Sequence, residues 1–198
     1  HCTNCCKQLK WRELIPIFSW VLLGGKCRYC YKRISYRYPL IELITGLLFY
    51  LLFLKFGLSG AFISHSILCS ILIIVTFIDI EFQIIPNELV LIGAIVGIIL
   101  ILTEISVHWM DAIIGMFIGG GIYLIVAILS QFLLKKEGMG GGDIKLMAMI
   151  GLMIGWKLTI ISILLSVYIG GLIGGLLLLL RIKKRGDVIP YGPFIAIG

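Results

Sequence analysis

Residues 60–79 read GAFISHSILCSILIIVTFID, a stretch whose only carboxylate is its last residue, Asp79. An α-helix needs about 20 consecutive apolar residues to cross the hydrocarbon core of a bilayer, so this stretch predicts a membrane span. Because similar runs recur along the chain, we expect an all-α fold, a polytopic membrane helix bundle. The other predicted spans are 39–56, 87–104, 110–134, 143–156 and 157–180, and the sequence turns apolar again at 189.

The overall composition supports a membrane protein. Of the 198 residues, 60% are hydrophobic and only 14% are charged, and the mean hydropathy is +1.11. Soluble domains average about 45–50% apolar and about 25% charged residues. The composition therefore excludes a disordered chain, a coiled coil and an ordinary soluble enzyme.

The lysine and arginine residues orient the predicted spans. Eight lie in residues 1–37, three in 135–145 and four in 181–187, whereas Lys55 and Lys157 are the remaining two. If the spans alternate in direction, the three basic segments share one side, which the positive-inside rule makes cytoplasmic. The net charge of +7 is then a signal of topology, and we expect a lipid bilayer and no nucleic acid as partner.

The polar N-terminal region, residues 1–37, carries two C-x2-C pairs. Cys2 and Cys5 are followed, after a spacer of 21 residues, by Cys27 and Cys30. This spacing approximates that of a structural four-thiolate zinc site, and a reducing compartment disfavours disulfides. Unpaired surface thiols are the alternative. Either of the neighbouring residues, Cys6 or His1, could replace a ligand of the first pair.

Two aspartates stand at the edges of predicted spans. Asp79 ends one apolar run and Asp143 begins another, directly after the glycines 140–142. The topology places both at cytoplasmic helix ends, where they could meet as an aspartyl protease pair that shares one proton. The alternatives are that Asp143 is a helix N-cap, that Asp79 is a solvated helix end, or that Asp79, Glu81 and Asp143 form a metal site.

Glycines are also spaced for helix packing within the predicted spans. Three Gly-x3-Gly pairs begin at Gly115, Gly170 and Gly171, and this spacing is typical of close contacts between membrane helices. A groove that admits a substrate helix is the alternative.

Taken in order, these motifs resemble the bifunctional type IV prepilin peptidases, a family of membrane aspartic proteases. The resemblance covers almost the whole chain. Beyond the cysteine pairs, it rests on Ile15-Pro16 with Ser19-Trp20, Gly25-Lys26-Cys27, 37–42 (RYPLIE), Ile78-Asp79 with Pro86, 137–145 (EGMGGGDIK) and 189–193 (IPYGP).

The resemblance implies an activity and its participants. Such enzymes cleave the leader of a prepilin or pseudopilin after a glycine, at the cytoplasmic side of the bacterial inner membrane, and then methylate the new N-terminus with S-adenosylmethionine. By position, Asp79 and Asp143 would be the catalytic pair. Residues 38–198 would form the peptidase domain, and residues 1–37, with zinc on Cys2, Cys5, Cys27 and Cys30, a region linked to methylation.

The resemblance also suggests residues for methyl transfer and further segments of the chain. Gly25, Lys26 and Glu42 are the candidates for methyl transfer. The family usually has another helix before the cysteine region, so we expect the sequence, which begins at His1 and stops within an apolar stretch, to be a fragment. Two other functions compete with this one. The protein could be a transporter or ion channel that uses the paired carboxylates, or a zinc module that only docks partners.

Overall fold

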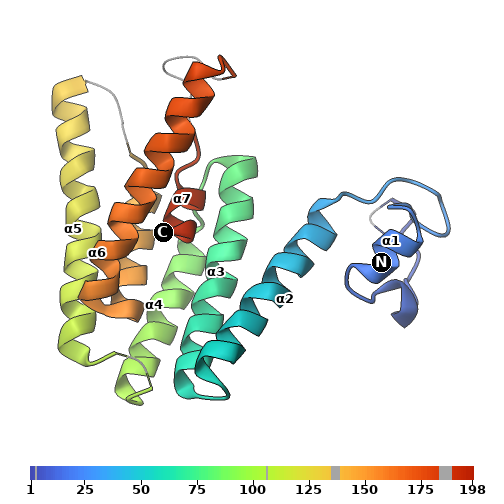
Figure 1. Ribbon diagram of the computed structural model, residues 1–198, viewed down its shortest axis with the longest axis horizontal. Coiled ribbons are helices and arrows are strands. Elements are labelled where there is room, and N and C mark those ends of the chain that lie inside the picture. The colour runs from blue at the N-terminus through green and yellow to red at the C-terminus, as the bar shows by residue number, and fades with distance from the viewer. Residues whose placement is uncertain (3, 106, 135–138, 183–188) are drawn as a thin grey trace. The chain divides into compact units, whose positions relative to one another are not determined.

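Helices are the main secondary structure in the part of the chain that the computed structural model describes, which is residues 1–198 except 3, 106, 135–138 and 183–188 (Figure 1). The only extended pairing among these residues is an isolated bridge between Lys26 and Arg33. The predicted all-α class is therefore confirmed. Several residues used above lie outside the described ones: Thr3, Lys135, Lys136, Glu137, Gly138, Lys183, Lys184 and Arg185.

The chain forms two compact units, His1–Lys55 and Phe56–Gly198. Four helices in the described residues are long and apolar enough to cross a membrane: α2 (Arg37–Phe56), α3 (Gly60–Phe82), α5 (Trp109–Leu134) and α6 (Gly141–Leu179). The multi-pass prediction is supported by these helices. The functional boundary predicted at 37/38 stays a prediction, because the first compact unit also includes most of α2.

The N-terminal unit begins with short, irregular elements held by hydrogen bonds. They are η1 (Trp11–Glu13) and α1 (Phe18–Leu22), which precede the long helix α2. The Trp20 indole N–H donates to the Ile34 carbonyl at 3.2 Å, and the Ile34 N–H donates to the Gly25 carbonyl at 2.7 Å. Gly25 has a φ of +68°, and a Cβ there would lie 2.8 Å from the Trp20 ring. A glycine is therefore required at this position.

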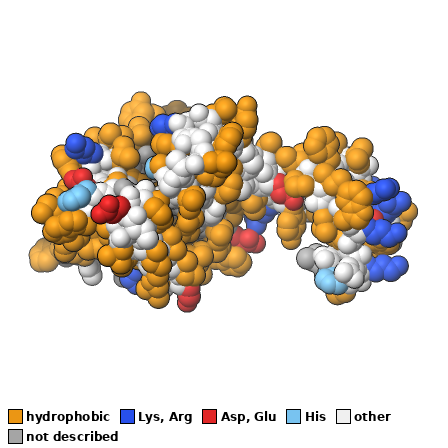
Figure 2. Space-filling view, turned by 90° about the horizontal axis from the view of Figure 1, so that it is seen from below, with side chains coloured by type: hydrophobic (Ala, Val, Ile, Leu, Met, Phe, Trp, Pro, Cys, Tyr) orange, Lys and Arg blue, Asp and Glu red, His pale blue; other side chains and the backbone are white. Residues whose placement is uncertain are grey.

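Helix α2 presents apolar side chains to its surroundings along its whole length. It has 20 residues, and none of them is buried within the protein. Hydrophobic side chains also predominate on the visible face of the molecule (Figure 2). Apolar surface of this extent is expected to contact lipid. The exposed residues of α2 include Leu43, Leu47, Tyr50, Leu51 and Leu54.

The C-terminal unit begins with α3, which is followed by the shorter α4 (Asn87–Leu102). The Ser59 hydroxyl caps α3 by accepting the Phe62 N–H at 3.3 Å. Gln83, in the left-handed conformation with a φ of +55°, ends the helix, and Pro86 is the N-cap of α4. The predicted spans 60–79, 87–104 and 110–134 agree with α3, α4 and α5 to within three residues.

Helix α6 is a hairpin of two arms, residues 141–154 and 156–179, that turns at Gly155. Gly155 has a non-helical conformation with a φ of +76°. A Cβ on Gly119 would lie 2.5 Å from the Met147 carbonyl oxygen and 3.2 Å from Thr159 Cγ2. A straight helix would separate residues 147 and 159 by about 18 Å, so the arms must run side by side. The predicted break between 143–156 and 157–180 is confirmed to within two residues.

Close glycine contacts join α5 to this hairpin. A Cβ on Gly115 would collide with the Gly151 carbonyl oxygen, and a Cβ on Gly151 would collide with that of Gly115. The packing role predicted for the pair that begins at Gly115 is confirmed. For Gly171 and Gly175 it stays a prediction, because no described residue lies within 4 Å of a Cβ at either position.

The short helix α7 (Gly192–Ile197) fills the space between α3 and α6, with which it makes most of its contacts (Figure 1). Its side chains Phe194 and Ile195 are buried. The apolar rise predicted at 189 therefore leads into a helix of six residues within the described chain. Its first residues lie beside the end of α3, which prepares the site described next.

Candidate functional site

Asp79 lies in the last turn of α3 and is only 5% exposed. The backbone N–H of Gly192, at the start of α7, donates to Asp79 Oδ2 at 2.9 Å. A Cβ on Gly192 would lie 2.8 Å from the same oxygen, so a glycine allows this approach. The bend after α3 and the insertion of α7 together hold the carboxylate in place.

Asp143 lies in the first turn of α6 and is 8% exposed. Its Oδ2 accepts the N–H of Gly140 at 3.2 Å; Gly140 is the N-cap residue, so Asp143 is not the N-cap itself but the third residue of the helix, whose side chain reaches back to the cap. This contact and a catalytic role are compatible, because one hydrogen bond leaves the other carboxylate oxygen available. Gly142 permits the turn to pack closely, since a Cβ there would lie 2.9 Å from Ile85 Cβ.

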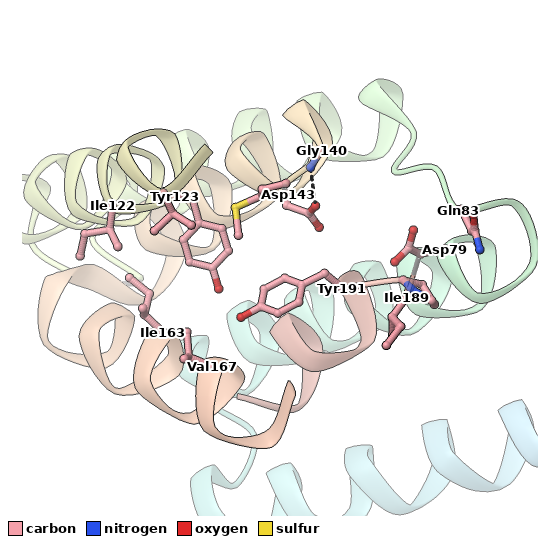
Figure 3. A pocket seen from close by; sticks show the side chains of 13 residues that line it. Asp79, Gln83, Ile122, Tyr123, Gly140, Asp143, Ile163, Val167, Ile189 and Tyr191 are labelled. Atoms are coloured by element: carbon pink, nitrogen blue, oxygen red, sulfur yellow. Dashed lines mark hydrogen bonds between the residues drawn. The ribbon is translucent and has the colours of Figure 1, made fainter. Parts of the chain in front are cut away.

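The two aspartates, 64 positions apart in the sequence, line one cavity of about 460 Å³ (Figure 3). Their carboxyl groups point into the same space, with the Tyr191 ring beside them. A smaller neighbouring cavity of about 320 Å³ is lined by both aspartates and by Asn87 and Lys145. Lys145 Nζ donates to Asn87 Oδ1 at 3.0 Å, which connects α6 to α4.

The rest of the larger cavity is mainly apolar. Two carboxyl groups at the end of an apolar cavity can share a proton, activate water and polarise a carbonyl group. Tyr123 and Tyr191 add two hydroxyls, and the Tyr123 hydroxyl lies 2.9 Å from Ser166 Oγ. The aliphatic lining residues are Ile122, Val126, Ile163, Val167 and Ile189.

The remaining acidic candidates have structural surroundings. Asp111 Oδ1 accepts the Trp156 indole N–H at 2.9 Å, which ties the start of α5 to the bend of α6. Glu81 does not join the aspartates in a metal-binding cluster among the described residues. Glu42 Oε2 accepts the Ile17 N–H at 2.8 Å, so its partner is backbone from the polar N-terminal region.

The four predicted zinc ligands come together in the N-terminal unit. The Sγ atoms of Cys2, Cys5, Cys27 and Cys30 all lie within 4.8 Å of one another. Cys2 Sγ and Cys30 Sγ are 3.9 Å apart. Tetrahedral zinc with Zn–S bonds of about 2.3 Å requires about 3.8 Å between sulfur atoms, so this donor set fits zinc.

The two C-x2-C segments adopt the same turn. In the first, the Cys2 N–H donates to the Lys7 carbonyl and the Cys6 N–H to the Cys2 carbonyl. In the second, the donors are the corresponding Cys27 and Tyr31 N–H groups. Cys6 and Tyr31 both have a positive φ, 51° and 57°. Cys6 therefore corresponds to Tyr31, the left-handed residue that follows the second cysteine pair. This correspondence favours Cys5 over Cys6 as the zinc ligand.

Backbone N–H groups directed at the sulfur atoms favour thiolates. Those of Cys5 and Asn4 lower the pKa of Cys2 to about 6, and that of Lys32 lowers the pKa of Cys30. The Lys7 N–H acts in the same direction on Cys5, but burial and the neighbouring thiols raise the pKa of Cys5 to about 11. All four sulfur atoms could ionise together only with a cation among them, so the clustering of the four cysteines is compatible with a metal site.

The three residues suggested for methyl transfer occupy different places. Glu42 lines a cavity of about 480 Å³ within the N-terminal unit, together with Trp20 and Tyr38. Gly25 and Lys26 are not among its lining residues. Gly25 instead lies against the Trp20 ring, because a Cβ at this position would be only 2.8 Å from the ring.

Sequence reasoning missed several residues of both cavities. Tyr123 lies in the middle of an apolar run and carries no signal of its own. Tyr191 and Gly192 belong to the quoted 189–193 motif, but their contacts depend on where α7 packs. Glu13 lines the N-terminal cavity, and its signal was available, because it is the only acidic residue in the strongly basic segment 1–37.

Comparison with known proteins assigns both parts of the chain. Residues 66–175 match the type IV leader peptidase family, and residues 1–56 match the bacterial peptidase A24 N-terminal domain. No solved structure matches the chain.

Curated relatives match nearly the whole chain. A prepilin leader peptidase/N-methyltransferase of Stutzerimonas stutzeri is 37% identical over 197 residues, which covers 100% of this chain and 68% of the relative. The protein of the same name from Pseudomonas aeruginosa is 36% identical, covering 99% of this chain and 68% of the relative. The one from Myxococcus xanthus is 33% identical over 94% of this chain and 55% of the relative. The chain therefore belongs to the type IV leader peptidase family.

Proposed function

We propose that this protein cleaves the leader peptide of type IV prepilins or pseudopilins and then N-methylates the new terminus. Cleavage follows a glycine at the cytoplasmic side of the inner membrane, with Asp79 and Asp143 as the catalytic pair. The observation that carries the proposal is that two buried carboxylates, from helix ends far apart in sequence, line one cavity. Family membership and the names of the relatives support both the peptidase and the methyltransferase activity.

The pair acts as a general base and a general acid. The ionised carboxylate takes a proton from water as the water oxygen attacks the scissile carbonyl carbon, and the protonated carboxyl group hydrogen-bonds the carbonyl oxygen. When the tetrahedral intermediate collapses, the C–N bond breaks and the leaving amine takes up the proton that the first carboxylate removed from water. The N–H groups of Gly192 and Gly140 each hold one carboxylate oxygen, which orients the other toward the reactants.

The cavity suits a substrate that is polar at the cleaved bond and apolar beyond it. A prepilin carries a charged leader followed by a hydrophobic helix, and the aliphatic side chains of the cavity match the apolar part. The placement of fifteen of the 17 basic residues in three segments of one predicted side supports a cytoplasmic site.

Zinc and the methyl donor belong to the N-terminal unit in this proposal. A closed four-cysteine zinc site has no free position for a reactant, so it stabilises the unit rather than reacting. S-Adenosylmethionine supplies the methyl group when it is bound. Residues of the N-terminal unit would hold this donor and bring its methyl group to the new terminal amine, which would lose a proton in exchange.

The test is cleavage of a prepilin with a glycine–phenylalanine junction by the purified protein in detergent. We expect Asp79→Asn and Asp143→Asn each to abolish cleavage, while Glu104→Gln, an exposed acid outside both cavities, keeps it. Folding of each variant is checked by its thermal unfolding. Cleavage at the wild-type rate by either aspartate variant would show that this aspartate is structural.

Transport or ion conduction is the less favoured alternative, because the paired carboxylates alone fit it but the family does not. A second alternative is that the protein is a zinc module that only docks partners. It would be supported if zinc removal abolished partner binding while no pilin-like substrate was ever cleaved. Proton flux in vesicles that is lost in both aspartate variants, again without cleavage of any substrate, would favour transport.

A further inference from the structure

The N-terminal unit has a cavity that the peptidase reaction does not use. Its volume is about 480 Å³, and its lining residues come from both cysteine turns, η1, α1, residues 32–35 and the start of α2. Aromatic side chains, Trp20 and Tyr38, line it together with the basic side chains Lys32 and Arg33. Two carboxylates, those of Glu13 and Glu42, are also part of its wall.

Glu13 is the unexplained group of this cavity. Its side chain is 5% exposed, and its Oε2 accepts the Lys10 N–H at 2.9 Å. Its Oε1 is buried without a hydrogen-bond partner among the described residues. A buried carboxylate oxygen that lacks a donor costs free energy unless a positive charge lies close to it.

The cation nearest to Glu13 is a weak partner. Arg28 Nη1 lies 3.7 Å from Oε1, beyond hydrogen-bond distance, and the Arg28 side chain is 65% exposed. Water screens such an ion pair, so it offsets little of the cost of burying the carboxylate. Glu42 differs from Glu13, because its Oε2 receives a short hydrogen bond from the Ile17 N–H.

We propose that this cavity is the methyl-transfer site and that Glu13 is the residue that binds the positively charged onium group there. The inference rests on the proposed function. The onium group is the sulfonium of S-adenosylmethionine or the terminal ammonium of the cleaved substrate, and both are organic cations that favour a buried carboxylate and aromatic faces. Arg33 and Lys32 suit the carboxylate of an amino-acid ligand, and Trp20 and Tyr38 suit a flat heterocycle.

The first test compares two ligands of the full-length protein by equilibrium binding. S-Adenosylhomocysteine lacks the methyl group and with it the positive charge on sulfur, but is otherwise alike. If Glu13 binds the sulfonium, wild-type protein prefers S-adenosylmethionine by about tenfold or more, and Glu13→Gln loses this preference; tenfold corresponds to about 1.4 kcal/mol. Glu13→Asp, which keeps the charge, restores part of it, and Glu104→Gln leaves it unchanged.

The second arm tests the substrate ammonium. If Glu13 binds that group, Glu13→Gln leaves the affinity for S-adenosylmethionine unchanged and raises the KM of methylation for the cleaved substrate by about tenfold or more. Prepilin cleavage stays at the wild-type value in either case, because Asp79 and Asp143 lie in the other unit. Zinc content also stays at the wild-type value, because Glu13 is not part of the four-cysteine cluster. These two readouts also show that the variant is folded.

The inference is overturned if Glu13→Gln keeps both the ligand preference and the KM of the wild type. It is also overturned if wild-type protein binds the two ligands equally and if Glu13→Asp and Glu13→Gln have the same KM of methylation for the cleaved substrate. The comparison between these two variants does not depend on how either one folds relative to the wild type. Failure of the proposed function is distinct, because wild-type protein would then neither cleave a prepilin nor methylate it.

Discussion

Gly192→Ala tests whether α7 positions the catalytic pair. The added Cβ would lie 2.8 Å from Asp79 Oδ2, 3.2 Å from Cγ and 3.3 Å from Cβ, so either α7 or the aspartate must shift. The shift would lengthen the 2.9 Å hydrogen bond from the Gly192 N–H to the carboxylate. Hydrogen bonds to charged groups contribute about 1.5–3 kcal/mol, and about 1.4 kcal/mol corresponds to tenfold in rate.

We therefore expect kcat/KM for prepilin cleavage to fall by about 10- to 150-fold if the whole bond is lost in the transition state. The assay is leader cleavage in detergent, followed by gel shift, with thermal unfolding measured on the same preparations. Gly171→Ala is the matched control, since the described residues leave open space beside it. A Gly192→Ala protein that cleaves at the wild-type rate with wild-type stability would refute a positioning role for this N–H group.

Four other substitutions test the remaining parts of the structure. Cys5→Ser is expected to lose bound zinc and Cys6→Ser to keep it, as metal analysis of the purified proteins would reveal; equal zinc contents would contradict the assigned turn. Gly151→Val pushes a side chain into the backbone of α5, so we expect a loss of about 1–3 kcal/mol or more in the free energy of unfolding and a lower Tm. An unchanged Tm would argue against the contact. Gly25→Ala places a side chain in a left-handed conformation, which costs about 1–2 kcal/mol, and displaces the Trp20 ring. Methylation should fall while leader cleavage persists, and parallel loss of both activities would show that the effect spreads beyond the N-terminal unit.

Much of the architecture could be predicted because membrane spans follow from local composition. The boundaries of α3, α4 and α5 agree with the apolar runs, since a run of about 20 apolar residues has few alternatives to a helix in lipid. The break near Gly155 could also be predicted, because a continuous apolar run of residues 143–180 is too long for one span.

The site could be predicted only in part. The cysteine pairs and the two aspartates carry local signals, namely a ligand spacing and a charge at the edge of an apolar run. Gly192 and Tyr123 carry none, because a glycine N–H or a tyrosine acquires a role only from what packs against it. Glu13 has a local signal in its charge, but its buried, unpartnered oxygen depends on how η1 folds.

Local sequence patterns are enough to identify an all-helical membrane protein with a four-cysteine region and two aspartates at helix ends. Each of these properties depends only on residues that are close together in the sequence, because neighbouring residues set the hydropathy, the charge and the ligand spacing. Long-range packing alone makes α6 fold back on itself and α7 insert beside α3, which brings Gly192 to Asp79 and both aspartates to one cavity. These contacts join residues far apart in sequence, and they depend on side-chain volume and backbone approach that no local pattern specifies.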